Sequence, residues 1–296
     1  MMDIVKNKTE TETSNSVWRV ESANLAEWQA VIAWAKDEGW DMGIGDANAF
    51  FEVDDQGFFI GYLGKEPVAA MSVVNYSSRF SFLGHYLVSP AYRGQGYGLK
   101  LCQSAFYHGG ERCMGLDGMP AQVDNYAKWG FAGDRYNLRM VGQVQQDYHC
   151  PDHIALVQAA DIDALIAYDQ SCTGIDRSAL LKHWFIGETR YGFICRSGQE
   201  VTGIIGVRQS QEGYRVGPLF ASSPDLVEPL FIAALSAVPQ GGKVTLDVPE
   251  KTDRTLISLA ETHGFESIFQ TLRMYRGEPP KEQEHKVWCI ASLELG

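Results

Sequence analysis

A glycine-rich segment near residue 95 has the residue types and spacing to bind a phosphate-containing ligand. An apolar run over residues 82–88 ends at Ser89-Pro90, and a helical pattern begins at Leu99. Between them lies the sequence Arg93-Gly94-Gln95-Gly96-Tyr97-Gly98. Glycines allow positive φ and close approach of a ligand, and a helix N-terminus adds free N–H groups and the positive end of its dipole. The segment therefore predicts a strand, a turn and a helix that bind a pyrophosphate. A glycine-rich turn that binds nothing is the alternative.

Two common phosphate-binding motifs fit this segment poorly. A P-loop would close on Gly-Lys-Ser/Thr, whereas Gly98 is followed by Leu99-Lys100. A dinucleotide fingerprint would space its glycines as G-x-G-x-x-G, whereas the glycines here alternate at positions 94, 96 and 98.

The segment instead resembles the acyl-CoA loop of the GNAT N-acetyltransferase superfamily. That loop reads Gln/Arg-x-x-Gly-x-Gly/Ala after the lead-in V-x-P-x-x. Arg93, Gly96 and Gly98 match the loop, and Val88 and Pro90 match the lead-in. The resemblance implies that the ligand is acetyl-CoA, a co-substrate that brings the acetyl group to be transferred.

The second half of the chain repeats the first. Gly130-Phe131 recurs as Gly264-Phe265, and Leu138-Arg139-Met140 recurs as Leu272-Arg273-Met274, both 134 residues later. Such self-similarity indicates a duplicated unit. Each half alternates predicted strands and helices in the GNAT order. We therefore predict an α/β (α+β) fold of two tandem GNAT-like units, each a mixed, mostly antiparallel sheet flanked by helices.

The predicted boundaries follow from the repeat and from Pro151, which interrupts the pattern between the halves. Residues 1–16 are polar and lack an apolar stretch, so we expect a disordered leader there. Residues 17–147 form the expected acyl-CoA-binding GNAT domain. Residues 152–296 form the expected degenerate copy.

The second copy lacks the glycine-rich loop. Aligning Pro224 with Pro90 replaces the loop residues Arg93, Gly94, Gly96 and Gly98 by Val227, Glu228, Leu230 and Ile232. A carboxylate and bulky side chains would exclude a pyrophosphate from this position. We therefore predict one acyl-CoA site per chain, in the first domain.

The resemblance also implies which residues hold the donor. In GNAT proteins the fourth strand gives backbone hydrogen bonds to the pantetheine arm, and a motif N-x-x-x-x-G-F follows the fifth strand. The matching positions are Tyr86, Leu87, Val88, Arg93, Gly94, Gln95, Gly96, Tyr97, Gly98 and Asn125. Tyr126 falls where a family tyrosine protonates the departing thiolate, and its counterpart in the second copy is Ala260. A tyrosine that only packs is the alternative.

Two side chains are candidates for the base that deprotonates the acceptor amine. Asp117 lies on the predicted fifth strand, but the second copy retains Asp247 at this position, which also allows a structural role. His85 has no polar counterpart in the second copy, and imidazole titrates near neutral pH. A histidine packed in the sheet is the alternative.

The loop after the first predicted helix covers the acceptor side in this family. It contains Trp40, Asp41 and Asp46, which together can hold a cationic amine through cation–π contact and charge. The alternative is that Asp46 caps a helix and Trp40 belongs to the core. If these residues hold the acceptor, the partner is a small-molecule amine. Such a substrate can carry a positive charge in addition to the reacting amine.

The composition disfavours several other classes of protein. The net charge of −12 would repel nucleic acid, and no apolar run approaches the ~20 residues of a membrane helix. The six cysteines form no C-x-x-C pair, and no cluster has metal-ligand spacing. We therefore expect a cytoplasmic protein with reduced thiols and no metal, either a monomer or a homodimer.

The resulting hypothesis is an acetyl-CoA-dependent N-acetyltransferase. It would move an acetyl group directly to a primary amine of a small molecule or peptide. The alternative from another class is a non-catalytic acyl-CoA-binding sensor or interaction protein.

Overall fold

The structure is a computed structural model that describes residues 17–250 and 253–296. The leader predicted over residues 1–16 lies outside the described residues. The first half of the chain forms strands β1 (Trp18–Ser22), β2 (Phe58–Leu63), β3 (Glu66–Asn75), β4 (Phe80–Val88), β5 (Cys113–Gly118) and β6 (Ala132–Gln143). Its helices are α1 (Leu25–Asp37), α2 (Asp46–Phe51), α3 (Tyr97–Gly109) and α4 (Val123–Ala127).

The second half follows the same order of elements. Its strands are β7 (Ile154–Leu156), β8 (Ile186–Gly187), β9 (Arg190–Ser197), β10 (Glu200–Gln209), β11 (Tyr214–Ala221), β12 (Lys243–Pro249), β13 (Glu266–Arg276) and β14 (Val287–Cys289). Its helices are α5 (Ile162–Thr173), α6 (Ser178–Leu181), α7 (Val227–Ser236) and α8 (Thr255–Thr262). The mixed, mostly antiparallel architecture flanked by helices agrees with the predicted fold class.

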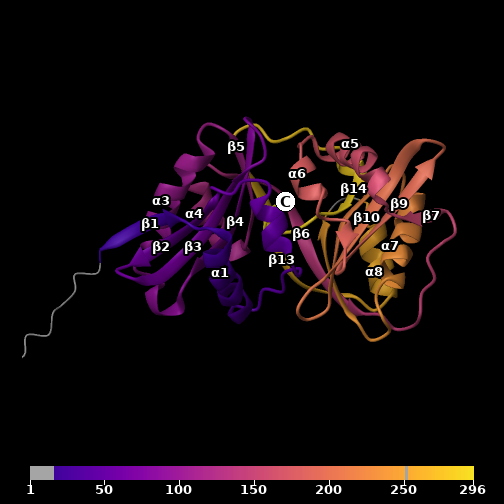
Figure 1. Cartoon of the computed structure of the whole chain (residues 1–296), viewed down its shortest axis with the longest axis horizontal. Helices are drawn as coiled ribbons and strands as arrows, with labels where there is room; N and C mark the ends of the chain where they lie inside the picture. The colour runs from indigo at the N-terminus through magenta and orange to yellow at the C-terminus, as the bar shows by residue number, and fades with distance from the viewer. Residues whose placement is uncertain (1–16, 251–252) are drawn as a thin grey trace, which may run out of the picture.

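The described strands join in one 14-stranded sheet that runs through both halves (Figure 1). The order along the main path is β1-β2-β3-β4-β5-β13-β6-β12-β11-β10-β9-β7. The last long strand of each half is therefore exchanged. β13 pairs with β5 of the first half, and β6 pairs with β12 of the second half. β6 and β13 also pair with each other at the centre.

Two reciprocal ion pairs tie the exchanged strands to their new neighbours. Arg139 on β6 donates from Nε and Nη2 to Asp247 on β12, at 2.7 and 2.8 Å. Arg273 on β13 makes the same bidentate contact with Asp117 on β5, at 2.9 and 2.7 Å. These arginines are the middle residues of the repeated Leu-Arg-Met motif. Bidentate, buried pairs of this kind fix register as well as contributing energy.

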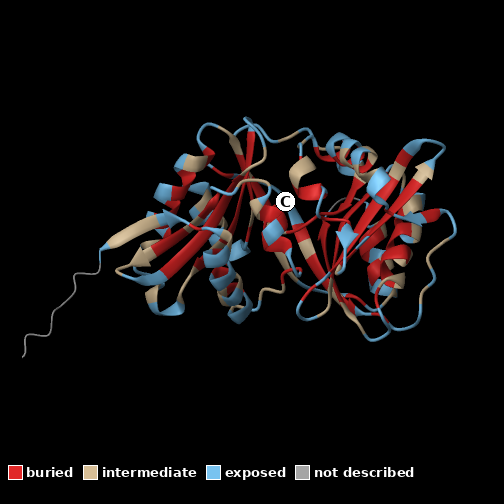
Figure 2. Cartoon of the chain, viewed as in Figure 1, coloured by how far each residue is buried: buried red, intermediate tan, exposed pale blue. Residues whose placement is uncertain are grey.

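Apolar residues of both halves are buried along the two faces of the sheet, beneath the helices (Figure 2). Helix α1 begins at a capping box in which the Asn24 side chain accepts from the Glu27 amide. Its buried face is formed by Trp28, Val31 and Ala35. Glu38 and Trp40 follow α1 in the chain. The packing of α1 places both residues in the lining of the two cavities described below.

We expect Asp247→Asn to destabilise the protein by about 3–5 kcal/mol, because it leaves Arg139 and Arg215 buried without their carboxylate partner. Burial alone would raise the pKa of Asp247, but the charges of Arg139 and Arg215 lower it below its usual value. The native contact is therefore present above the unfolded pKa of about 4 and is lost as pH falls through the lower folded pKa.

The measurement is denaturant unfolding near neutral pH, with the exposed Asp55→Asn as the control, which should change stability by less than about 0.5 kcal/mol. Equal stability of the two variants would show that the exchanged strands do not depend on this pair.

Candidate acyl-CoA and acceptor site

Strands β4 and β5 separate halfway along their length and open a gap in the sheet. They pair only between residues 80–83 and 113–116. On its other side, β4 shifts register against β3 between Ala70 and Ser72, and His85 adopts a φ of 49°. This bulge turns the remainder of β4 away from β5. Tyr86, Leu87 and Val88 lie in this part of β4 and line the cavity beside it.

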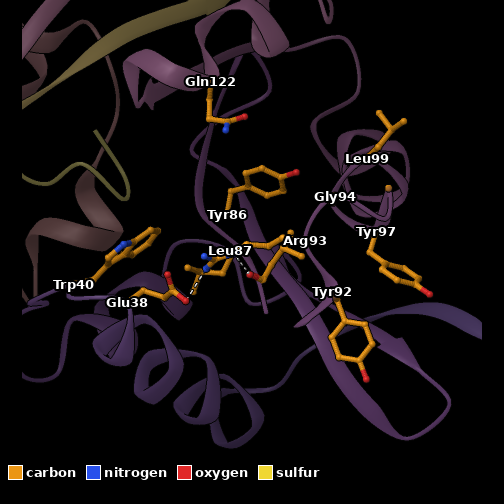
Figure 3. Close-up of a pocket in the computed structure, with 13 residues that line it drawn as sticks. Glu38, Trp40, Tyr86, Leu87, Tyr92, Arg93, Gly94, Tyr97, Leu99 and Gln122 are labelled. Atoms are coloured by element: carbon orange, nitrogen blue, oxygen red, sulfur yellow. Dashed lines mark hydrogen bonds and ion pairs between the residues drawn. The ribbon is translucent and has the colours of Figure 1, made fainter. Parts of the chain in front are cut away.

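The glycine-rich loop lines a cavity of about 570 Å³ at the outer end of this gap (Figure 3). Most of the residues expected to hold the donor surround it: Tyr86, Leu87, Val88, Arg93, Gly94, Gly96, Tyr97 and Gly98. Gly94 and Gly96 have φ of 72° and 81°, and a Cβ on either would meet nothing within 4 Å. The open backbone before helix α3 therefore has the conformation and the space that a pyrophosphate needs.

Gly98 has a different role from the other two glycines. A Cβ at this position would overlap the hydroxyl oxygen of Tyr86 on β4. The glycine lets the first turn of α3 pack directly on β4. It thereby holds the helix N-terminus beside the strand gap.

Arg93 reaches across the mouth of the cavity. Its Nε donates to the Val88 carbonyl at 2.9 Å, and its Nη2 forms an ion pair with Glu38 at 2.6 Å (Figure 3). A pyrophosphate bound at the loop would compete with Glu38 for this guanidinium.

Two residues that the resemblance assigned to the donor do not line this cavity. The Gln95 amide donates to the Ala91 carbonyl at 2.8 Å. The exposed Asn125 side chain bonds Gln122 and Lys128. Both side chains make local contacts, as Arg93 does, and their assignment to the donor stays a prediction.

A second cavity of about 350 Å³ adjoins the first and extends towards the other half of the chain. The two share the lining residues Glu38, Trp40, Tyr86 and Gln122. The second cavity is also lined by Leu83, Gly84, His85, Leu116, Asp117, Met119, Tyr126, Arg139, Phe269, Thr271, Leu293 and Glu294. An acyl donor in the first cavity and an acceptor in the second would meet at the shared residues.

Tyr126 lies on α4, half-buried, and lines the second cavity. Burial raises the pKa of its phenol above the usual value, and the neighbouring Cys102 and Tyr86 raise it further. The hydroxyl is therefore protonated near neutral pH, and the raised pKa makes it a weaker acid than a free phenol. Tyr126, which the sequence analysis named as a candidate general acid, thus lines the second cavity.

His85 is buried in an aromatic box made by Trp28, Trp40 and Phe50, within the second cavity. Burial lowers its pKa to about 4, so the ring is neutral in the physiological range. Its Nδ1 lies 2.9 Å from the Ser72 hydroxyl, and its Nε2 has no partner among the described residues. This differs from the expectation of a histidine poised near neutral pH.

Asp117 is held in a structural ion pair rather than available as a base. Its carboxylate accepts two bonds from Arg273 and one from Asn137 at 2.7 Å, and its side chain is fully buried. The alternative noted for its twin Asp247 therefore applies to Asp117 as well. We withdraw it as a catalytic candidate.

Asp41 and Asp46 are turned away from both cavities, contrary to the expectation for an acceptor loop. Asp41 accepts from the Ser210 hydroxyl at 2.7 Å. Asp46 accepts from the Gly43 amide and forms ion pairs with Arg190 and Arg208. These carboxylates dock the loop onto the second half. Trp40 alone of the three lines the cavities.

The matching gap in the second half is closed by the chain itself. Strands β11 and β12 pair only between residues 214–216 and 244–246. β14 then pairs with β11 where the strands diverge, and a Cβ on Gly217 would overlap the Ile290 carbonyl oxygen. The cavity near this point is about 20 Å³. Because β14 and the residues after it occupy the gap, a second donor has no room there.

Three of the lining residues that the sequence did not indicate lie on the exchanged strands. Phe269 and Thr271 reach the site on β13, and Arg139 reaches it on β6. The repeated Leu-Arg-Met motif identified these two strands in the sequence. It did not indicate that each strand pairs with the other half of the chain. Glu38 and Glu294 also line the second cavity, and no motif pointed to either.

The part of the chain that the structure describes offers no helix long and apolar enough to cross a membrane. Nor do the described residues include a cluster of three or more His, Cys, Asp or Glu side chains placed to hold a metal ion.

Comparison with known families matches each half separately. Residues 20–132 match the "Acetyltransferase (GNAT) family", and residues 165–289 match an "Acetyltransferase (GNAT) domain". The chain is 47% identical to holothin acyltransferase from Pseudoalteromonas sp. (strain SANK 73390), over 95% of this chain and 96% of that protein. The chain therefore belongs to the GNAT family of acyltransferases, with two GNAT domains in tandem.

Solved structures show the same fold at low sequence identity. A putative acetyltransferase from Pyrococcus horikoshii has a TM-score of 0.80 and 16% identity, covering 98% of this chain and 99% of that one. A tandem GNAT protein from the clavulanic acid biosynthesis pathway has a TM-score of 0.61 and 12% identity, covering 88% and 98%.

We expect one acetyl-CoA to bind per chain, and Gly96→Val to weaken that binding by about 10- to 100-fold. A β-branched residue at φ of 81° costs about 1–3 kcal/mol, so the loop would leave its binding conformation. Isothermal calorimetry gives both the stoichiometry and the affinity.

Gly241→Val is the matched control. Gly241 has a φ of 80° and nothing within 4 Å of its Cβ position, but it lies in the second half, away from the cavity. Two sites per chain, or equal affinity in the two variants, would contradict the assignment of the loop.

Proposed function

We propose that the protein transfers the acetyl group of acetyl-CoA to a primary amine of a small molecule, holothin or a compound of its kind. The observation that carries the proposal is the continuity of two cavities. One lies beside an open glycine-rich loop, and the other is lined by Tyr126 and by mostly apolar side chains. The near full-length identity of 47% to a holothin acyltransferase supports the choice of acceptor.

The residues of the first cavity bind and orient the donor. Arg93 and the N–H groups before α3 face the position of a pyrophosphate, and the backbone of β4 faces the pantetheine arm. The donor supplies a thioester carbonyl, which is open to attack by an amine. Because the cavities meet at Tyr86 and Gln122, an arm extended along β4 ends at the acceptor cavity.

Tyr126 supports the chemistry as a proton donor. Departure of the thiol requires a proton, and the Tyr126 hydroxyl in the lining of the second cavity is the group assigned to provide it. Direct attack of the amine on the thioester in a ternary complex needs no covalent enzyme intermediate. Trp40 and Phe269 provide flat apolar surfaces that fit a compact acceptor better than a highly charged one.

Turnover is tested by following release of free thiol from acetyl-CoA in the presence of holothin, with the product identified by mass spectrometry. Acetylated holothin is the expected product. Binding of acetyl-CoA without any amine-dependent thiol release would instead indicate a non-catalytic acyl-CoA-binding protein.

We expect Tyr126→Phe to lower kcat about 100-fold while the Kd for acetyl-CoA stays within about twofold, because a general acid acts in the transition state. Steady-state kinetics and calorimetry provide the two numbers. Tyr107→Phe is the matched control, since Tyr107 is 87% exposed on α3. If kcat of the Tyr126 variant stays within about twofold of the parent, Tyr126 is a packing residue.

A further inference from the structure

The last residues of the chain cross the centre of the molecule between its two halves (Figure 1). After β14, the Ile290 amide bonds the Asp247 carbonyl, and the Ala291 carbonyl accepts from Arg208 at 3.0 Å. The segment then reaches the first half, where the Leu295 carbonyl accepts from the Tyr76 hydroxyl at 3.0 Å. Residues 290–296 are therefore held in place by both halves.

Glu294 lies where this segment passes the bulge of β4. A Cβ on Gly84 would overlap the Glu294 backbone, so the glycine permits this close approach. Glu294 lines the second cavity, as Tyr126 and Met119 do. The residue is only 8% exposed.

Glu294 differs from the other buried acids in forming no ion pair among the described residues, although Arg139 and Arg215, both paired with Asp247, lie close enough to interact with its charge. Asp46, Asp169 and Asp247 each form an ion pair with at least one arginine. Glu294 has no hydrogen bond or ion pair among the described residues. A buried carboxylate is costly unless it is paired. The partner that the cavity can supply is a group on the acceptor.

The charged and titratable groups around Glu294 leave it as the base at this site. The groups that face it or share its cavity are Glu38, His85, Tyr86, Asp117, Tyr126, Arg139 and Arg215. Asp117 is committed to Arg273, burial lowers the pKa of His85 to about 4, and Glu38, which is paired with Arg93, lies in the lining that the two cavities share. Glu294 lines the second cavity and has no hydrogen bond or ion pair among the described residues.

We propose that the Glu294 carboxylate receives the proton of the attacking amine. This inference rests on the proposed function. As the amine nitrogen bonds to the thioester carbonyl carbon, its N–H bond breaks and an O–H bond forms on Glu294. The C–S electron pair leaves with the thiol sulfur, which takes its proton from Tyr126. Before the next cycle the proton on Glu294 passes to water and Tyr126 takes a proton back from water, so both residues return to their starting forms. The second half of the chain thereby contributes the base.

The test compares Glu294→Gln and Glu294→Ala with the parent, using acetyl-CoA and holothin. We expect kcat to fall about 100-fold in both, the scale of general base catalysis, with the Kd for acetyl-CoA within about twofold. Formate should restore turnover in the alanine variant, where it can occupy the vacated space, and not in the glutamine variant. Glu200→Gln, an exposed residue on β10, is the control.

The outcomes separate this inference from the proposed function. Turnover by the parent together with a glutamine variant within about twofold of it would overturn the role of Glu294 alone. So would equal losses in both folded variants, as judged by unchanged melting temperature, without any response to formate. Absence of turnover by the parent would overturn the proposed function and this inference with it.

Discussion

The exchange of β6 and β13 is the constraint on which the rest of the structure depends. Each half lacks the strand that completes its own sheet, and the Arg139–Asp247 and Arg273–Asp117 pairs fix the strand that the other half provides. A buried arginine left without its partner is costly, so neither strand can shift register without breaking a bidentate contact. The halves therefore fold as one body with a shared centre.

The shared centre makes the duplicated halves unequal. In the first half the gap beside β4 stays open and receives Phe269 and Thr271 from β13. In the second half the corresponding gap is occupied by β14, and the chain continues from there to the open gap. Residues of the second copy thus line the site of the first copy. A tandem chain can evolve its two copies independently in this way, whereas a homodimer of single units cannot.

Much of the fold and of the conformation of the glycine-rich loop could be predicted from sequence because it depends on local rules. Glycines at 94 and 96 require positive φ, and the turn precedes an amphipathic helix, so the loop was evident without any tertiary information. The acceptor side could not be predicted, because it depends on contacts between distant segments. Asp46 was compatible with an acceptor loop until Arg190 and Arg208, more than 140 residues later, were seen to pair with it. Glu294 lies in no motif, and its place at the site follows only from the path of the chain between the halves.

The central claim is that the second half builds the acceptor site of the first, and steady-state kinetics of Phe269→Ala test it most directly. Phe269 lies on β13 and lines the acceptor cavity, while its neighbour Ile268 is 59% exposed and serves as the control. Losing about 1.4 kcal/mol of apolar contact should raise KM for the acceptor about tenfold, with the Kd for acetyl-CoA within about twofold. An acceptor KM equal to that of Ile268→Ala and the parent would contradict the account.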